Sequence, residues 1–124
     1  MSHLGLIASD WAGAPIESWS SPEALASCRV DNEFATPLDN GCNSCAWNAM
    51  INPLKRTSLT RFILYGFEEN LIHNRDLFGC TFPALVASWR SEFSANSGTA
   101  PDAPFGFVQL STGSTRSAPR KCAK

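Results

Sequence analysis

Hydrophobic and polar positions follow one another in blocks along this chain, and the blocks predict an α/β domain. The apolar run at residues 4–8 is typical of a parallel strand covered on both faces. Residues 59–65 and 105–111 are rich in β-branched and aromatic side chains, which predicts two further strands. Helical patterns separate the three segments, and the order β-α-α-β-α-β favours a parallel sheet with right-handed crossovers.

Start and stop signals place the helices. Ser21 is predicted to cap a short helix that begins at Pro22, and Pro53 closes a helix whose apolar positions start at Trp47. Asn74 or Asp76 is predicted to begin a longer helix, which Pro83 should kink or split into two pieces. The apolar stripe of this helix contains Phe78, Phe82, Leu85, Val86, Trp89 and Phe93.

The stretch "IASDWAGAPIESW" at residues 7–19 indicates a strand, a tight loop and a helix. Pro15 suits the first helical turn because its φ angle is fixed. A Ser or Thr at position 14 would form a capping box with Glu17, but Ala14 accepts no hydrogen bond. We therefore expect this helix start to be weaker by about 1 kcal/mol. Gly13 permits a ligand to approach the backbone closely.

Length and charge limit the kinds of partner. A chain of 124 residues is one domain or a piece of one, and its 44% hydrophobic content is enough for a core. Its net charge is −1, but residues 112–124 hold four basic residues and no acid, which leaves −5 for residues 1–111. The acidic body argues against a nucleic-acid partner, and we interpret residues 112–124 as a basic, disordered tail.

Compartment and metal signals are weak. No run approaches the roughly 18 apolar residues that span a bilayer, and the start of the chain lacks a charged region typical of signal peptides. Five cysteines fit neither a complete disulfide framework nor a closed zinc site. Cys42 and Cys45 form a lone C-x-x-C, which is weak evidence for zinc or redox chemistry. We predict no metal, no cofactor and no membrane partner.

Five stretches, in order, carry a family resemblance. They are "GLIASDWAGAPIESWSS" at 5–21, "WNAMINPL" at 47–54, "EEN" at 68–70, "DLFGCTFPALVASWR" at 76–90 and "PFGFVQLS" at 104–111. Together they resemble the sialate O-acetylesterase family of the SGNH-type hydrolases. The resemblance implies that residues 1–111 form part of a doubly wound, flavodoxin-like three-layer α/β/α domain with about three parallel strands. It also implies a carboxylic ester hydrolase that removes O-acetyl groups from sialic acids in carbohydrate metabolism.

Family properties add two expectations. The family suggests a lysosomal or secreted protein, although without a signal peptide a cytoplasmic location stays open. Cys80 matches a family cysteine, which implies structural packing or a disulfide in a secretory lumen. The likeness does not decide between these roles.

Only part of the family's catalytic machinery has a match here. The family's nucleophilic serine lies in a Gly-Gln-Ser-Asn-Met segment and its histidine in an Asp-x-x-His segment, and neither occurs in these 124 residues. The chain therefore resembles the middle of the enzyme, as a truncated form, and we expect it to be inactive alone. By match to the family, Gly13 and Asn70 are the predicted oxyanion-hole donors. Trp11, which borders the proposed site, and Glu68 are the predicted contacts to an O-acetylated sialic acid or related acetylated sugar.

Several positions depart from the family pattern. Ala12 and Ala14 replace a glycine and a threonine, Phe67 replaces a glycine, and Glu69 replaces a serine. The added carboxylate at Glu69 is unfavourable because it repels the charge that an oxyanion site stabilises. A non-catalytic remnant or carbohydrate-binding pseudo-enzyme is therefore the alternative function.

The matched residues also have simpler interpretations. Gly13 in that case only makes a turn, and Asn70 only caps a loop. Ser9 and His73 are weaker local candidates for a nucleophile and a base. The catalytic interpretation predicts that the loops at 11–14 and 66–70 face each other at the carboxyl ends of neighbouring strands. An exposed sheet edge would also invite self-association.

Overall fold

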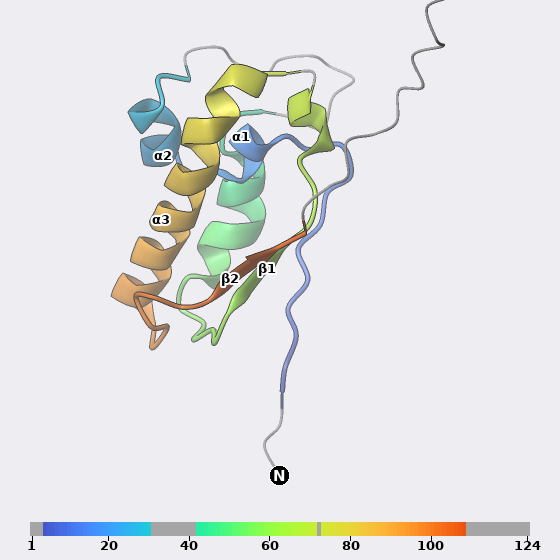
Figure 1. Ribbon diagram of the computed structural model, residues 1–124. Helices are drawn as coiled ribbons and strands as arrows, with labels where there is room; N and C mark the ends of the chain where they lie inside the picture. The colour runs from blue at the N-terminus through green and yellow to red at the C-terminus, as the bar shows by residue number, and fades with distance from the viewer. Residues whose placement is uncertain (1–3, 31–41, 72, 109–124) are drawn as a thin grey trace, which may run out of the picture.

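The computed structural model describes residues 4–30, 42–71 and 73–108, and these form a helical layer against a small parallel sheet (Figure 1). The predicted basic tail at 112–124 lies outside the described residues. The α-helices and strands are α1 (Ile16–Trp19), α2 (Pro22–Ser27), β1 (Phe62–Leu64), α3 (Phe78–Asn96) and β2 (Phe105–Phe107). A π-helical turn η1 (Trp47–Ile51) and three 3-10 turns, η2 (Asn52–Leu54), η3 (Glu68–Leu71) and η4 (Arg75–Leu77), connect them.

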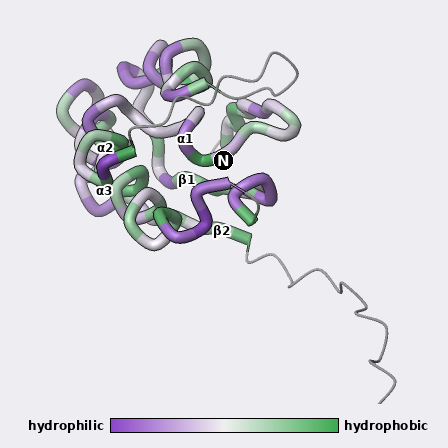
Figure 2. Tube along the Cα trace, turned by 90° about the horizontal axis from the view of Figure 1, so that it is seen from above, coloured by the Kyte–Doolittle hydropathy of each residue, from purple (hydrophilic) through white to green (hydrophobic). Residues whose placement is uncertain are grey.

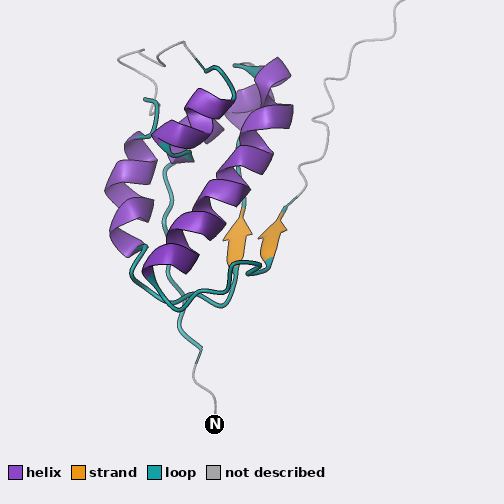
Figure 3. Cartoon of the chain, turned by 90° about the vertical axis from the view of Figure 1, so that its left-hand side faces the viewer, coloured by secondary structure: helices purple, strands orange, loops and turns teal. Residues whose placement is uncertain are grey.

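Strands β1 and β2 pair in parallel, which confirms that part of the expected architecture. Phe62 is in register with Phe105, and Leu64 with Phe107. The ladder continues one residue further, because the N–H of Val108 donates to the carbonyl of Leu64 over 3.0 Å. Both arrows point the same way in Figure 3, so the carboxyl ends of the two strands lie together at one edge of the sheet.

The helices lie on one side of this sheet (Figure 1), and aromatic side chains of α3 pack against β1. Leu85, Trp89 and Phe93, which belong to the predicted apolar stripe, are buried. The ring of Phe62 on β1 lies 5.9 Å from Trp89 and 5.2 Å from Phe93, measured between centroids. Figure 2 shows hydrophobic residues of β2 at the rim of the molecule. The inner face of the sheet is therefore covered, and an aromatic cluster holds it to α3.

The predicted first strand is wrong. Residues 4–8 form no strand in the structure, and Leu4 and Leu6 are 79% and 87% exposed. An apolar run becomes a buried strand only where a neighbour supplies ladder hydrogen bonds and other elements cover its faces. Among the described residues the sheet contains only β1 and β2. The described part is thus a partial α/β fold, and the three-layer, doubly wound arrangement stays a prediction.

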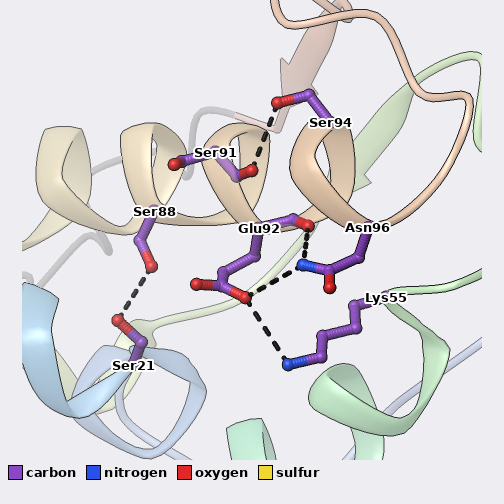
Figure 4. Close-up of polar contacts among 7 residues, drawn as sticks. All are labelled: Ser21, Lys55, Ser88, Ser91, Glu92, Ser94 and Asn96. Carbon is purple, nitrogen blue, oxygen red and sulfur yellow. Dashed lines mark hydrogen bonds and ion pairs between the residues drawn. The ribbon is translucent and has the colours of Figure 1, made fainter.

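The predicted cap of α2 is confirmed, and of the two outcomes expected at Pro83 the split into two helices does not occur. The N–H of Ala24 donates to Ser21 Oγ over 3.2 Å, which is the predicted cap, and Ser21 Oγ also lies 2.8 Å from Ser88 Oγ on α3 (Figure 4). Pro83 lies inside α3 without splitting it. A proline removes one helical hydrogen bond, and the buried residues that follow it hold the helix together despite that loss.

Polar and covalent links tie the other elements to α3. Lys55 Nζ, at the end of η2, lies 3.6 Å from Glu92 Oε2 (Figure 4). A disulfide joins Cys28, the C-cap of α2, to Cys80 in α3, so of the two roles that the family likeness left open for Cys80, the structure has the disulfide. The C-x-x-C cysteines form a second disulfide, Cys42–Cys45.

The part of the chain that the structure describes holds neither a metal-ligand cluster nor a helix that could cross a membrane. Within residues 4–30, 42–71 and 73–108 there is no cluster of three or more metal-ligating side chains. No helix in the same residues has the length and apolar character required to cross a membrane.

Candidate functional site

The loop before α1 is built around Gly13. The N–H of Ala14 donates to the carbonyl of Trp11 over 3.3 Å, and Gly13, the third residue of this turn, has φ 74°. A positive φ at the third position of a turn favours glycine because it has no Cβ. The loop ends at Pro15, the N-cap of α1, and no side chain of the cap residue satisfies the first turn. The cap therefore lies one residue later than the capping-box pattern predicts, at Pro15 and not at Ala14, and the weaker helix start stays a prediction.

Asn70 supplies the hydrogen bond that the local sequence cannot. Its Oδ1 accepts from the N–H of Ile16, the first residue of α1, over 2.8 Å. Asn70 lies in η3, in the loop that follows β1, and only 4% of its surface is exposed. Gly13 is three residues before Ile16, so their Cα atoms lie within about 11 Å of each other. The two stretches that carry the predicted oxyanion donors therefore meet at the start of α1.

The carboxylate of Glu17 is the centre of this contact. Glu17 is fully buried. Asn70 Nδ2 donates to its Oε2 over 2.9 Å, and Asn74 Nδ2 donates to its Oε1 over 2.9 Å. Its backbone carbonyl accepts from the N–H of Ser44, also over 2.9 Å. Burial of a carboxylate is costly unless hydrogen bonds compensate it, and both oxygens of this one have an amide donor.

Both amide hydrogens of Asn70 have acceptors. One is directed at Glu17, and the other at the backbone carbonyl of His73, with an Nδ2···O distance of 3.3 Å. The second bond is at the long end of the range for an N–H···O hydrogen bond, so it is the weaker of the two. An oxyanion can gain a donor from Asn70 only by replacing one of these acceptors.

The remaining predicted site residues are more accessible. Gly13 is exposed, and so is Trp11, at 51%. Glu68 is exposed at the start of η3, two residues before Asn70. Of the two weaker candidates, Ser9 is half-buried in the extended segment before the Gly13 turn, and His73 is exposed. The start of α1 thus lies between an exposed glycine turn, three residues before it in the sequence, and a buried asparagine that accepts from its first N–H.

A cavity of about 530 Å³ opens at the carboxyl ends of β1 and β2, where open α/β sheets place ligands. Asn70 lines it, whereas Gly13, Trp11 and Glu68 are not among its lining residues. The walls are mostly apolar and comprise Leu64, Gly66, Phe67, Leu71, Arg75, Phe78, Gly79, Phe82, Phe107 and Val108. Asn70 is therefore the residue that connects the start of α1 with the cavity.

Phe67 holds an unusual backbone conformation beside this cavity. Its φ is 77°, in the region that a bulky side chain rarely adopts, and this is the position at which the family resemblance has a glycine. Its ring lies 6.3 Å from that of Phe78 and 6.4 Å from that of Phe82. The packing of these rings holds a strained residue next to Asn70.

Sequence reasoning missed the partners of Asn70. Glu17 was read as part of an incomplete capping box, and Asn74 only as a helix cap. The signal for Glu17 was its place in the "PIESW" stretch, which matches the family beyond the loop residues themselves. No local pattern indicates that a carboxylate in a four-residue helix receives its donors from residues more than 50 positions away.

Comparison with known proteins gives a likeness of the same kind. The fold and the site define a partial α/β unit with a buried asparagine at the carboxyl edge of its sheet. Human sialate O-acetylesterase is 44% identical over 115 residues, as is the protein of that name from Pongo abelii. The rat sialate O-acetylesterase is 38% identical over 142 residues. No family model matches the chain.

These alignments cover most of this chain but a small part of the relatives. They include 88% of the chain and 22% of the human protein or 26% of the rat protein. The chain therefore corresponds to about a quarter of the length of these relatives. The activity and substrate of the whole relatives do not follow from this likeness alone.

Proposed function

We propose that this chain is the part of a sialate O-acetylesterase-type ester hydrolase that holds the oxyanion of the acetyl group. Gly13 donates its backbone N–H and Asn70 donates from Nδ2 to the acetyl carbonyl oxygen, and pre-aimed donors of this kind stabilise the charge that develops there. Trp11 and Glu68 contact the acetylated sugar. The serine and histidine that complete the reaction are matched by no segment of these 124 residues.

The observation that carries this proposal is the contact between Asn70 and Ile16. It joins the stretch around Gly13 to the stretch that ends in Asn70, and both stretches belong to the likeness with the sialate O-acetylesterases. Asn70 also lines the cavity at the carboxyl ends of the parallel strands, the usual place for a ligand in this class of fold, which supports the proposal. The three-layer, SGNH-type arrangement of the complete domain is part of the same proposal.

A non-catalytic binding function is the second candidate, and two observations favour it. Both amide hydrogens of Asn70 have protein acceptors, and Glu69 adds a carboxylate next to Asn70. In this second function the chain binds an O-acetylated sugar without turnover. The two candidates share the ligand and differ in the chemistry that follows binding.

Calorimetric titration of the purified chain with O-acetylated sialic acid, and with the same sugar lacking the acetyl group, tests the ligand. We expect the acetylated form to bind about tenfold more tightly, because only it offers a carbonyl oxygen to the donors. Glu68→Gln should alter the affinity, whereas Glu23→Gln, which removes an exposed carboxylate on α2, should not. Equal affinity for the two sugars would contradict the proposal.

Turnover then separates the two candidates. An activated acetate ester should be hydrolysed by the chain alone no faster than in buffer, since the nucleophile and the base are essential to such a site. Restored hydrolysis after addition of a polypeptide that carries the missing serine and histidine segments supports the esterase. Binding that persists without any restored turnover supports the second candidate. Turnover by the chain alone that disappears in Ser9→Ala would overturn the assignment of roles.

A further inference from the structure

We infer that Glu17 is a positioning residue that aims the side-chain amide of Asn70 into the proposed oxyanion site, an inference that rests on the proposed function. Glu17 does not reach the ligand, since it is fully buried beneath Asn70 in the first turn of α1. Its role is to fix the orientation of the Asn70 amide, with Oδ1 toward the N–H of Ile16 and Nδ2 toward the carboxylate.

The chemistry of the neighbours determines the orientation of the amide. The N–H of Ile16 can only donate, so the Asn70 atom 2.8 Å away from it must be the carbonyl oxygen Oδ1. A carboxylate can only accept, so the Asn70 atom 2.9 Å from Glu17 Oε2 must be the nitrogen Nδ2. A flipped amide would place an oxygen against the carboxylate and an NH₂ group against an N–H. Two independent neighbours therefore exclude the flip.

The same geometry identifies the hydrogen that a ligand would receive. With Oδ1 on Ile16 and one hydrogen on Glu17, the amide plane is fixed, and only the second hydrogen of Nδ2 can change its acceptor. That hydrogen is now donated to the backbone carbonyl of His73, with an Nδ2···O distance of 3.3 Å. An incoming oxyanion is a stronger acceptor than a neutral carbonyl, because hydrogen bonds to charged groups are shorter and stronger. Replacement of the His73 carbonyl therefore leaves the other two bonds intact.

Glu17 holds Asn70 in this way only while its two oxygens both accept. Asn74 Nδ2 occupies Oε1, so neither oxygen is without an amide donor. In Glu17→Gln one of the two oxygens becomes an NH₂ group, which then faces the amide donor of either Asn70 or Asn74. The size of the side chain is unchanged and only its ability to accept is reduced. This substitution therefore separates orientation from packing.

The test is the nuclear magnetic resonance spectrum of the Asn70 side-chain amide in an isotope-labelled chain, recorded with and without O-acetylated sialic acid. In the wild-type chain we expect two well-separated hydrogen resonances, of which one moves on addition of the acetylated sugar. In Glu17→Gln we expect both resonances to shift and the acetyl-dependent affinity to fall about tenfold. Glu23→Gln, the matched loss of an exposed carboxylate, should leave the spectrum and the affinity unchanged.

The outcomes distinguish this inference from the proposed function. If the wild-type chain binds both sugars equally, the proposed function fails, whereas the Asn70 resonances still test the contact with Glu17. If Glu17→Gln keeps the wild-type Asn70 resonances and the wild-type preference for the acetylated sugar, the inference is overturned. If Glu17→Gln does not fold, exchange of the Asn70 amide hydrogens with solvent in the wild-type chain decides. Slow exchange supports the inference, and exchange as fast as that of the exposed Asn48 overturns it.

Discussion

Asn70 Nδ2 and Glu17 Oε2 lie 2.9 Å apart although 53 positions separate the two residues in the sequence. Pro15, the N-cap of α1, makes no side-chain hydrogen bond to the helix, and Asn70 Oδ1 instead accepts from the first N–H of the helix, that of Ile16. The loop after β1 and the start of α1 are therefore one structural unit. An asparagine predicted for chemistry also maintains the local fold, so its substitution should affect both.

Ser18 in α1 and Ser20 at its C-cap provide a prediction about stability. Ser18 and Ser20 are both fully buried, but Ser20 Oγ donates to the carbonyl of Ile16 over 2.9 Å, whereas Ser18 Oγ has no partner among the described residues. Ser18→Ala should raise the free energy of unfolding by about 1 kcal/mol, and Ser20→Ala should lower it by about the same amount. Urea unfolding of the two variants gives the comparison, and equal effects in the same direction would contradict it.

The strained backbone at Phe67 predicts an inverted order of two substitutions. Phe67→Ala and Phe67→Gly both remove the ring contacts, but only glycine accepts a φ of 77° without a penalty. Phe67→Gly should therefore be more stable than Phe67→Ala by about 1 kcal/mol. The control is Ala87→Gly on the exposed face of α3, where glycine should cost about 1 kcal/mol. Thermal or urea unfolding measures the stability of the two Phe67 variants, and of Ala87→Gly against the unchanged chain. A Phe67→Gly variant that is less stable than Phe67→Ala would show that residue 67 is not strained.

The two disulfides should differ in their contribution to stability. Cys28–Cys80 closes a loop with a sequence separation of 52, and Cys42–Cys45 one with a separation of 3. In the chain-entropy account the longer loop contributes about 4 kcal/mol and the shorter about 2 kcal/mol. Replacing each pair by serines and comparing the free energies of unfolding tests this. A larger loss from the Cys42–Cys45 pair would contradict it.

Self-association is expected from the outer face of the sheet. Ile63 and Tyr65 are each 73% exposed on or next to β1, and exposed apolar faces and open strand edges favour pairing with other chains. Ile63→Lys should shift the sedimentation coefficient toward that of a monomer, whereas Thr60→Lys, at an exposed polar position, should not. A wild-type chain that sediments as a monomer and unfolds cooperatively above about 65 °C would contradict this expectation.

Sequence reasoning succeeded where the signal is local. Ser21 caps α2 because a serine before a Pro-Glu pair is a helix start by its own chemistry, and the β-branched and aromatic residues around Phe62 and Phe105 predict strands. It failed for residues 4–8, because an apolar run does not say whether a neighbouring strand is present to pair with it. The split expected as one outcome at Pro83 does not occur, because packing of the buried residues of α3 outweighs one lost hydrogen bond, and the kink stays a prediction.

The candidate site stays a prediction, and the sequence indicated its residues but not the contacts around them. Gly13 and Asn70 are visible as positions that match a family pattern, and the structure adds how each is held. The burial of Glu17, and the fact that Asn70 bonds to it, depend on contacts between distant residues that no window of sequence contains. The contact between Asn70 and Glu17 is therefore a property of the fold.

The central claim is that Gly13 and Asn70 hold an acetyl carbonyl oxygen, and residue-resolved magnetic resonance titration tests it most directly. Addition of O-acetylated sialic acid to the isotope-labelled chain should move the backbone amide resonance of Gly13 and the side-chain amide resonance of Asn70 together, with the same concentration dependence. The sugar without its acetyl group should move neither resonance. Equal shifts with both sugars, or movement of only one of the two residues, would contradict the account.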